Sequence, residues 1–191
     1  IDCGLAFPDD DMPGIDLVIP DFSYVIKNKE KVRGVFLTHG HEDHIGALSY
    51  LLKEVNVPVY SARLTIGLVE GKLKEAGILN SAKLNVQKAG DVVKMGAISV
   101  EFIAVNHSIP DACGFAIFTP AGTLVHTGDF KIDYTPVDGQ MIDLARFGEL
   151  GRHGVLALMS DSTNAERPGM TPSERRVGES FEMLFKKAGD R

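Results

Sequence analysis

The sequence predicts an α/β fold, and two features of the chain carry that prediction. First, short apolar runs rich in β-branched residues, too short for helices, alternate with segments whose apolar residues recur at helical spacing. Second, histidines and aspartates directly follow three of the strand-like runs, as expected where ligands bind beyond the strand ends of a layered α/β protein. With 191 residues, the chain has room for one domain with a substantial core.

The first half of the chain predicts a β-α-β unit. Residues 32–37 are expected to form a buried strand, residues 43–54 a helix, and residues 57–60 a second strand. The apolar stripe of this helix is Ile45, Leu48, Leu51, Leu52 and Val55. Residues 62–76 predict the next helix, which ends at Gly77. Its stripe of Leu64, Leu68 and Leu73 is expected to face the core.

The second half of the chain predicts mainly strands, followed by a last helix. The strand-like runs are residues 83–86, 92–95, 98–105, 114–119, 123–127 and 155–159. Two of them predict a hairpin around Pro120-Ala121-Gly122, and the last predicts a buried strand. Thr171-Pro172-Ser173-Glu174 is typical of a capping box with proline at the first helical position. The apolar residues of the last helix are Val177, Phe181, Leu184 and Phe185.

Composition and cysteine usage favour a cytoplasmic protein. No segment reaches the roughly 18 apolar residues of a membrane span, and the N-terminus lacks the pattern of a secretory signal. Cys3 and Cys113 form no C-x-x-C pattern, so both are predicted to be reduced and buried. The net charge of the chain is −6, whereas most nucleic-acid-binding proteins carry a basic surface patch. Bound metal cations would therefore be the source of local positive charge.

Six side chains at predicted strand ends are candidate metal ligands. Three histidines and an aspartate fall within residues 39–44, and no fold needs so many histidines there for packing. The set is His39, His41, Asp43, His44, His107 and Asp129. Imidazoles and carboxylates are ligands that zinc and manganese prefer. Asp43 also suits the positive end of the predicted helix, so capping and ligation both explain it.

The spacing of these residues allows a site for two ions. The first ion would be bound by His39, His41 and His107, the second by Asp43 and His44, and Asp129 would bridge both. Two ions about 3.5–4 Å apart can lower the pKa of a bridging water to about 7 and support in-line hydrolysis of a phosphodiester. Asp43, His44 and Asp129 would then be catalytic through the bound hydroxide, with zinc as the first candidate metal and manganese as the second.

The order H-x-H-x-D-H, then a lone histidine, then a lone aspartate resembles the metallo-β-lactamase superfamily. Local sequence narrows the resemblance to the ribonuclease J family, of the β-CASP branch that processes nucleic acid. The stretches that carry it are Asp2-Cys3-Gly4, Phe7-Pro8, His44-Ile45-Gly46-Ala47 and residues 107–112, 126–131 and 160–169. The resemblance extends from residue 2 to about residue 191, and the last two stretches are the most specific.

The resemblance implies a four-layer αββα sandwich that is incomplete here, with N-terminal strands and the C-terminal half missing. Residues 1–168 would be a partial metallo-β-lactamase domain, and residues 169–191 the last helix leading into an absent β-CASP domain. In the family a histidine from beyond this segment completes the second metal site, so we expect one ion to bind well and the second weakly. Asp2 resembles a family aspartate that orients a metal-bound imidazole, although an ordinary strand-end turn explains it as well.

The resemblance also implies a zinc-dependent ribonuclease that hydrolyses RNA from the 5′ end, and internally, in RNA processing and decay. RNA would be the substrate, and the full-length protein would form a homo-oligomer or pair with a sister ribonuclease, without membrane contact. Two alternatives stay open. One is another hydrolase on this scaffold, acting on a thioester, lactam or small phosphodiester; the other is a non-catalytic subunit that binds RNA or a sister nuclease. The isolated chain is expected to be weakly active or inactive.

Several other polar residues carry secondary expectations. Asp161 and Ser162 follow a predicted buried strand, so they either border the metal site or cap the next loop. His126 is expected to be structural, and His153 is expected to be exposed in a turn. Arg167 and Lys131 are candidate contacts for RNA phosphate.

Overall fold

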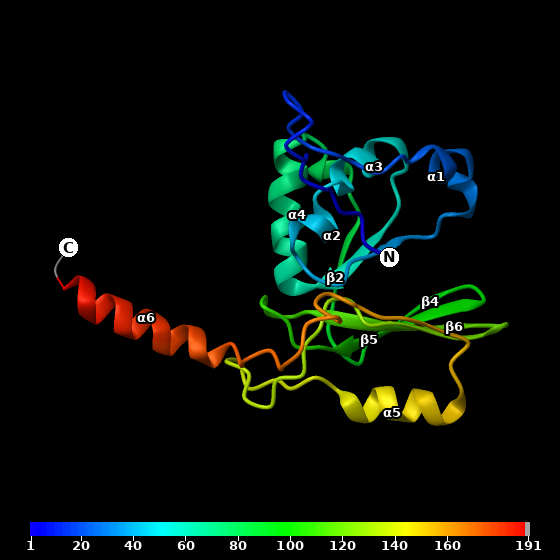
Figure 1. The fold of residues 1–191 in the computed structure, drawn as a ribbon. Helices are drawn as coiled ribbons and strands as arrows, with labels where there is room; N and C mark the ends of the chain where they lie inside the picture. Colours follow the sequence, from blue (N-terminus) through cyan, green and yellow to red (C-terminus); the bar gives the residue numbers. More distant parts are fainter. Residues whose placement is uncertain (190–191) are drawn as a thin grey trace.

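Two β-sheets lie face to face with helices on their outer sides in the computed structural model, which describes residues 1–189 (Figure 1). The smaller sheet is parallel, with the order β1 (Val35–Phe36), β2 (Val59–Ala62) and β3 (Leu84–Gln87). The predicted β-α-β unit is therefore present. Strand β1 is shorter than the predicted residues 32–37, although the Leu37 amide still donates to the Tyr60 carbonyl at 3.0 Å.

The larger sheet has five strands in the order of the chain. They are β4 (Val92–Met95), β5 (Ile98–Ala104), β6 (Cys113–Thr119), β7 (Gly122–His126) and β8 (Ala157–Met159). Neighbours from β4 to β7 are antiparallel, whereas β8 runs parallel to β7. The predicted hairpin is the β6–β7 pair, in which Thr119 lies opposite Gly122.

Helices cover both sheets from outside, and one helix extends away from them (Figure 1). The α-helices are α1 (Ser23–Lys27), α2 (Glu42–Ile45), α3 (Leu48–Glu54), α4 (Arg63–Glu75), α5 (Leu144–His153) and α6 (Arg175–Ala188). Two short 3₁₀ helices cover Lys29–Lys31 and Leu79–Ser81. Helices α2 to α4 lie on the smaller sheet, α5 lies on the larger sheet, and α6 projects outward. No helix within residues 1–189 is long and apolar enough to cross a membrane.

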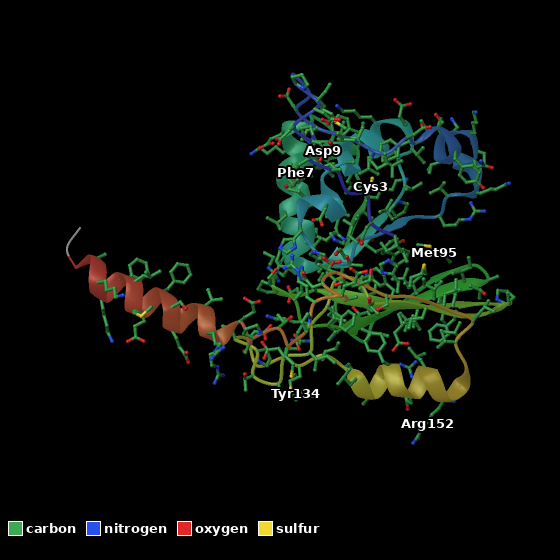
Figure 2. The ribbon with its side chains drawn as sticks, in the orientation of Figure 1. Cys3, Phe7, Asp9, Met95, Tyr134 and Arg152 are labelled. Atoms are coloured by element: carbon green, nitrogen blue, oxygen red, sulfur yellow. The ribbon has the colours of Figure 1, made fainter. Side chains whose placement is uncertain are left out.

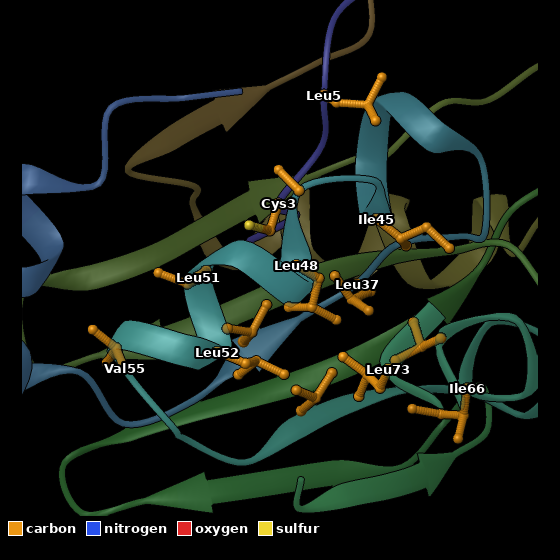
Figure 3. Packing of buried hydrophobic residues seen from close by; sticks show 14 residues of the cluster. Cys3, Leu5, Leu37, Ile45, Leu48, Leu51, Leu52, Val55, Ile66 and Leu73 are labelled. Carbon is orange, nitrogen blue, oxygen red and sulfur yellow. The ribbon is translucent and has the colours of Figure 1, made fainter. Parts of the chain in front are cut away.

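Three apolar clusters fill the spaces between the layers. Leucines of α3 and α4 pack on Leu37 and Val59 of the smaller sheet (Figure 3). Between the sheets, Phe36 packs with Phe102 and Phe115, whose ring centroids lie 5.0 Å apart. A third cluster joins the larger sheet to α5 and contains Ile103, Val125 and Leu150. The layer order is therefore αββα, as predicted.

The helix predicted over residues 43–54 is broken in two, because the N-terminal segment forms hydrogen bonds at the break. The Cys3 amide donates to the His44 carbonyl at 2.7 Å, and the Cys3 carbonyl accepts from the Ala47 amide at 3.0 Å. These bonds satisfy backbone groups at the end of α2 and just before α3 that have no partner within the helices. The apolar pattern is compatible with one helix, so only contact with a distant segment explains the break.

The leucine stripe predicted for residues 62–76 is only partly correct. Leu73 is fully buried, but Leu64 and Leu68 are exposed, and Ile66 and Val69 face the core instead. Both sets of residues have helical spacing. Packing against the sheet, rather than the sequence pattern, selects the buried face of α4.

The prediction of a buried strand at residues 155–159 is wrong about burial. Strand β8 occupies part of this segment, but Leu156, Leu158 and Met159 are all exposed. Within residues 1–189, β8 pairs with β7 and lies at the edge of its sheet. An edge position leaves apolar side chains uncovered that an inner strand would bury.

The two C-terminal helices depart from the sequence pattern. Helix α5 is not predicted, because its glycines lower helix propensity; the Asp143 carboxylate caps it by accepting from the Arg146 amide at 2.9 Å. Helix α6 begins at Arg175, so the predicted capping box is wrong. The Glu174 carboxylate pairs with Lys131 instead of capping the helix. The Ser173 hydroxyl donates to the Thr135 carbonyl and accepts from the amide of Arg175, the first residue of α6, at 3.3 Å.

Candidate metal centre

The loop after β1 brings three of the predicted ligands together. His39 is fully buried and lies three residues beyond the end of β1. His41 is the residue before α2, and His44 lies within this short helix. Because His44 lies next to the end of α2, the break between α2 and α3 also affects the conformation of the segment that carries this histidine.

Two more of the predicted ligands come from the larger sheet. His107 follows β5, and Asp129 lies in the turn after β7. Gly128 enters this turn with φ +60°, and a Cβ there would lie 2.9 Å from the Cys113 carbonyl oxygen. The turn therefore requires glycine directly before Asp129. Polar side chains crowd the space between the α2–α4 layer and the larger sheet (Figure 2).

The imidazoles converge on two overlapping groups of ligand atoms. His41 Nδ1 lies 3.0 Å from His39 Nε2 and 3.1 Å from His107 Nε2. His44 Nε2 lies 3.4 Å from Asp129 Oδ1, and His107 Nε2 lies 3.7 Å from Asp129 Oδ2. The two groups with ligand atoms within 4.8 Å of one another are His39, His41 and His107, and His39, His44 and Asp129.

Asp43 is the predicted ligand that stands apart. Its side chain is 63% exposed, and its Oδ2 atom lies 3.4 Å from His44 Nε2. It is in neither group of converging ligand atoms. Because it also occupies the first turn of α2, capping and ligation both still account for it.

Asp2 lies behind His44. Its Oδ2 atom is 2.8 Å from His44 Nδ1, and its Oδ1 atom accepts from the Thr38 amide at 2.8 Å. The carboxylate thus leaves His44 Nε2 free to face Asp129. This is the position expected of a carboxylate that orients an imidazole ligand.

Thr38 is a neighbour of the site that the sequence analysis misses. Its side chain is fully buried and contacts Asp2, His39 and His44. The available signal was its place directly before the histidine cluster, where a polar residue ends a predicted buried strand.

Burial and neighbouring charges set the protonation of the imidazoles. Burial, together with the charges of the surrounding histidines, lowers the pKa of His39 to about 2. Burial also lowers the pKa of His107, against the attraction of Asp129. Burial opposes protonation of His44 too, but its hydrogen bond to Asp2 and the nearby carboxylates raise its pKa overall. The neutral form, which offers a lone pair to a cation, is therefore favoured at His39 and His107, whereas the carboxylates near His44 favour its protonated form.

The donor set fits zinc. At Zn–N distances of about 2.0–2.1 Å, neighbouring ligand atoms of a tetrahedral site lie about 3.3 Å apart. The separations around His41 are close to this value. The carboxylate in the second group also suits manganese.

Other candidate residues lie outside this cluster. His126 Nδ1 accepts from the Gly128 amide at 3.0 Å, a structural contact within the turn. His153 is exposed and is the last residue of α5 rather than part of a turn. One oxygen of the Asp161 carboxylate accepts from the Thr163 amide at 2.8 Å, which caps the following loop. Its other oxygen accepts from the Phe130 amide at 3.5 Å, directly after Asp129, so Asp161 also borders the candidate site. Ser162 is exposed. Lys131 is largely buried and paired with Glu174, which removes it as a free contact for phosphate.

A cavity of about 820 Å³ adjoins the candidate metal site. His107 forms part of its wall, and the loop from Ser108 to Cys113 continues it. Three exposed cations also line the cavity, namely Arg63, Lys88 and Arg175. Five acidic residues line it as well, namely Asp91, Asp111, Asp133, Asp138 and Glu174.

Comparison with known proteins gives one family and a consistent set of relatives. Residues 1–147 match the sequence family described as the metallo-beta-lactamase superfamily. Over its full length the chain is 48% identical to ribonuclease J of Synechocystis sp. and 47% identical to ribonuclease J of Thermus thermophilus. It covers only 30% and 35% of these two proteins.

A solved structure shares the fold. The crystal structure of a protein of unknown function from Enterococcus faecalis V583 superimposes with a TM-score of 0.65 at 20% identity. The match covers 97% of this chain and 51% of that one. This likeness concerns the fold alone.

Proposed function

Because this chain belongs to the metallo-β-lactamase superfamily, we propose that it carries the metal centre of a ribonuclease that hydrolyses RNA phosphodiester bonds. The observation that carries the proposal is the convergence of four histidines and Asp129 from three separate segments. The similarity to proteins named ribonuclease J supports RNA as the substrate. Cleavage would proceed from the 5′ end and also internally.

We propose zinc as the metal, with manganese as the alternative. His39, His41 and His107 would hold the first ion, and Asp129 would bridge it to a second ion at His44. Asp43 is near enough to His44 to join the second position. When bound, two such ions supply Lewis acidity toward a phosphodiester. The second position has fewer ligands from this chain, so it would hold its ion more weakly.

The chain's own residues position the reaction. Asp2 would hold His44 in place, and burial would keep His39 neutral and ready to bind a cation. The cavity beside His107 would receive the RNA strand. Its three exposed cations could contact phosphates individually. Because five carboxylates also line the cavity and the net charge of the chain is −6, bound metal ions would supply most of the local positive charge.

We also propose a wider context for the chain. Residues 1–168 would form the metallo-β-lactamase part, and residues 169–191 would lead into a β-CASP domain that contributes to RNA binding. A histidine outside this sequence would complete the second metal position. The protein would act in the cytoplasm, as a homo-oligomer or with a sister ribonuclease.

Cleavage of 5′-monophosphorylated RNA by the full-length protein tests the function. His41→Ala and Asp129→Ala should each reduce cleavage by at least about 100-fold, because each removes a ligand of the proposed centre. A chelator should abolish activity in the parent protein. His153→Ala, which changes an exposed histidine on α5, should leave it unchanged. Undiminished turnover in both ligand variants would refute the proposal.

A further inference from the structure

The buried hydroxyl of Thr38 contacts residues of both proposed metal positions. Thr38 Oγ1 donates to Asp2 Oδ2 at 2.9 Å. The same oxygen lies 3.0 Å from His39 Nδ1 and 3.3 Å from His44 Nδ1. Thr38 and His39 are both fully buried, so water cannot replace these contacts. In the proposed arrangement His39 holds the first ion and His44 holds the second, and Thr38 Oγ1 contacts both rings.

The protons at this point can be assigned from the contacts. A carboxylate is an acceptor only, so the single hydroxyl proton of Thr38 goes to Asp2. His44 Nδ1, 2.8 Å from the same carboxylate oxygen, must carry a proton to make an attractive contact. Because this hydroxyl proton is donated to Asp2, Thr38 Oγ1 can only accept a hydrogen bond from His39 Nδ1. His39 therefore carries its proton on Nδ1 and turns the lone pair of Nε2 toward His41.

The backbone and methyl group of Thr38 hold the hydroxyl in place. Its amide donates to Asp2 Oδ1 at 2.8 Å, and its carbonyl accepts from the Cys113 amide at 2.9 Å. A Cβ on Gly128 would lie 3.1 Å from both the Cβ and the Cγ2 of Thr38. Thr38 thus packs against the turn that presents Asp129, as well as against the histidine segment.

From these contacts we propose that Thr38 is a positioning residue for both metal positions. Its hydroxyl fixes the Nδ1–H tautomer of His39 and ties that ring to the Asp2–His44 pair. Removing the hydroxyl leaves a buried N–H of His39 without an acceptor, which favours the other tautomer and withdraws Nε2 from metal binding. The inference rests on the proposed metal centre, but it concerns how the chain prepares that centre before any metal binds.

Histidine tautomers in the metal-free full chain, read by ¹⁵N–¹H correlation NMR, give the first test. The parent protein and Thr38→Ser should both carry the His39 proton on Nδ1. Thr38→Val keeps the shape of the side chain without the hydroxyl and should shift the proton wholly or partly to Nε2. A parent protein that carries this proton on Nε2 would overturn the inference. This outcome needs no variant, so the test still decides the question if Thr38→Val does not fold.

Zinc titration by calorimetry gives the second test. Thr38→Val should weaken zinc binding by about 10–100-fold, and Thr38→Ser should stay within about threefold of the parent. Thr123→Val on β7 is the matched control and should bind zinc normally. Unchanged tautomer and affinity in a folded Thr38→Val protein would contradict the proposal. A protein that binds zinc with the expected tautomer yet cleaves no RNA would refute the proposed function and leave the role of Thr38 intact.

Discussion

Asp2 adopts a backbone conformation that few residues other than glycine occupy. Its φ is +54°, which costs on the order of 1 kcal/mol for a residue with a Cβ. The conformation aims the carboxylate at the Thr38 amide and at His44 Nδ1. Hydrogen bonds to a partly buried carboxylate offset that cost, so strain and ligand orientation coincide at one residue.

Asp2→Ala should weaken binding of the second metal ion more than binding of the first. His44 would lose the acceptor that fixes its ring, and loss of such a partner typically reduces metal affinity by about 10–100-fold. Calorimetric zinc titration measures both ions. Asp9→Ala, on the exposed N-terminal segment seen in Figure 2, is the control. Equal affinities in all three proteins would show that Asp2 forms only a turn.

Both cysteine thiols should resist alkylation in the folded protein. Burial raises the pKa of Cys3 to about 11 and that of Cys113 to about 12. At pH 8 only about one thiol in a thousand would be ionised at a pKa of about 11, and the thiolate is the reactive form. Iodoacetamide labelling should therefore be at least about tenfold slower in native protein than in urea, and rapid native labelling would exclude this burial.

At the scale of elements, the N-terminal segment (residues 2–5) packs against both α2 and α3. Leu5 and Cys3 lie beside these helices and join their apolar cluster (Figure 3). Gly4 approaches so closely that a Cβ there would lie 1.6 Å from the Asp43 carbonyl oxygen. The packing of this segment therefore positions α2, which carries His44, as well as the carboxylate of Asp2.

Gly4→Ala should destabilise the protein by at least about 2 kcal/mol, because the new methyl group collides with backbone rather than with a movable side chain. Gly67→Ala is the matched control. Gly67 lies on the exposed side of α4 with open space around it, so alanine there should stabilise the protein by about 0.5–1 kcal/mol. Urea unfolding measures both changes. Equal stability of Gly4→Ala and the parent would show that the segment does not dock as described.

At the scale of the whole molecule, the layer order creates the candidate site. The smaller sheet supplies the histidine segment after β1, and the larger sheet supplies His107 and Asp129 after β5 and β7. Neither sheet alone holds a complete group of ligands. The phenylalanine cluster between the sheets keeps these strand ends together.

The apolar side chains of α6 leave a large face uncovered within residues 1–189. Phe181 is 54% exposed and Phe185 is 70% exposed, and their rings stack at 6.0 Å. Exposed apolar patches of this kind favour association. We expect the 191-residue chain to associate as its concentration rises, as measured by light scattering. Phe181→Glu with Phe185→Glu should reduce association, whereas Tyr24→Glu on α1 should not, and an unchanged monomeric mass in the parent would contradict this.

The sequence by itself determined the α/β class, the strand–helix order around the first sheet, and a set of candidate ligands of which five converge. It could do so because apolar periodicity and the position of histidines after strands are local properties of the chain. The gap in the helix over residues 43–54, the buried face of α4, the exposure of β8 and the contacts of Thr38 required the tertiary structure. Each depends on segments far apart in sequence, where packing and hydrogen bonding choose between patterns that local spacing leaves equivalent.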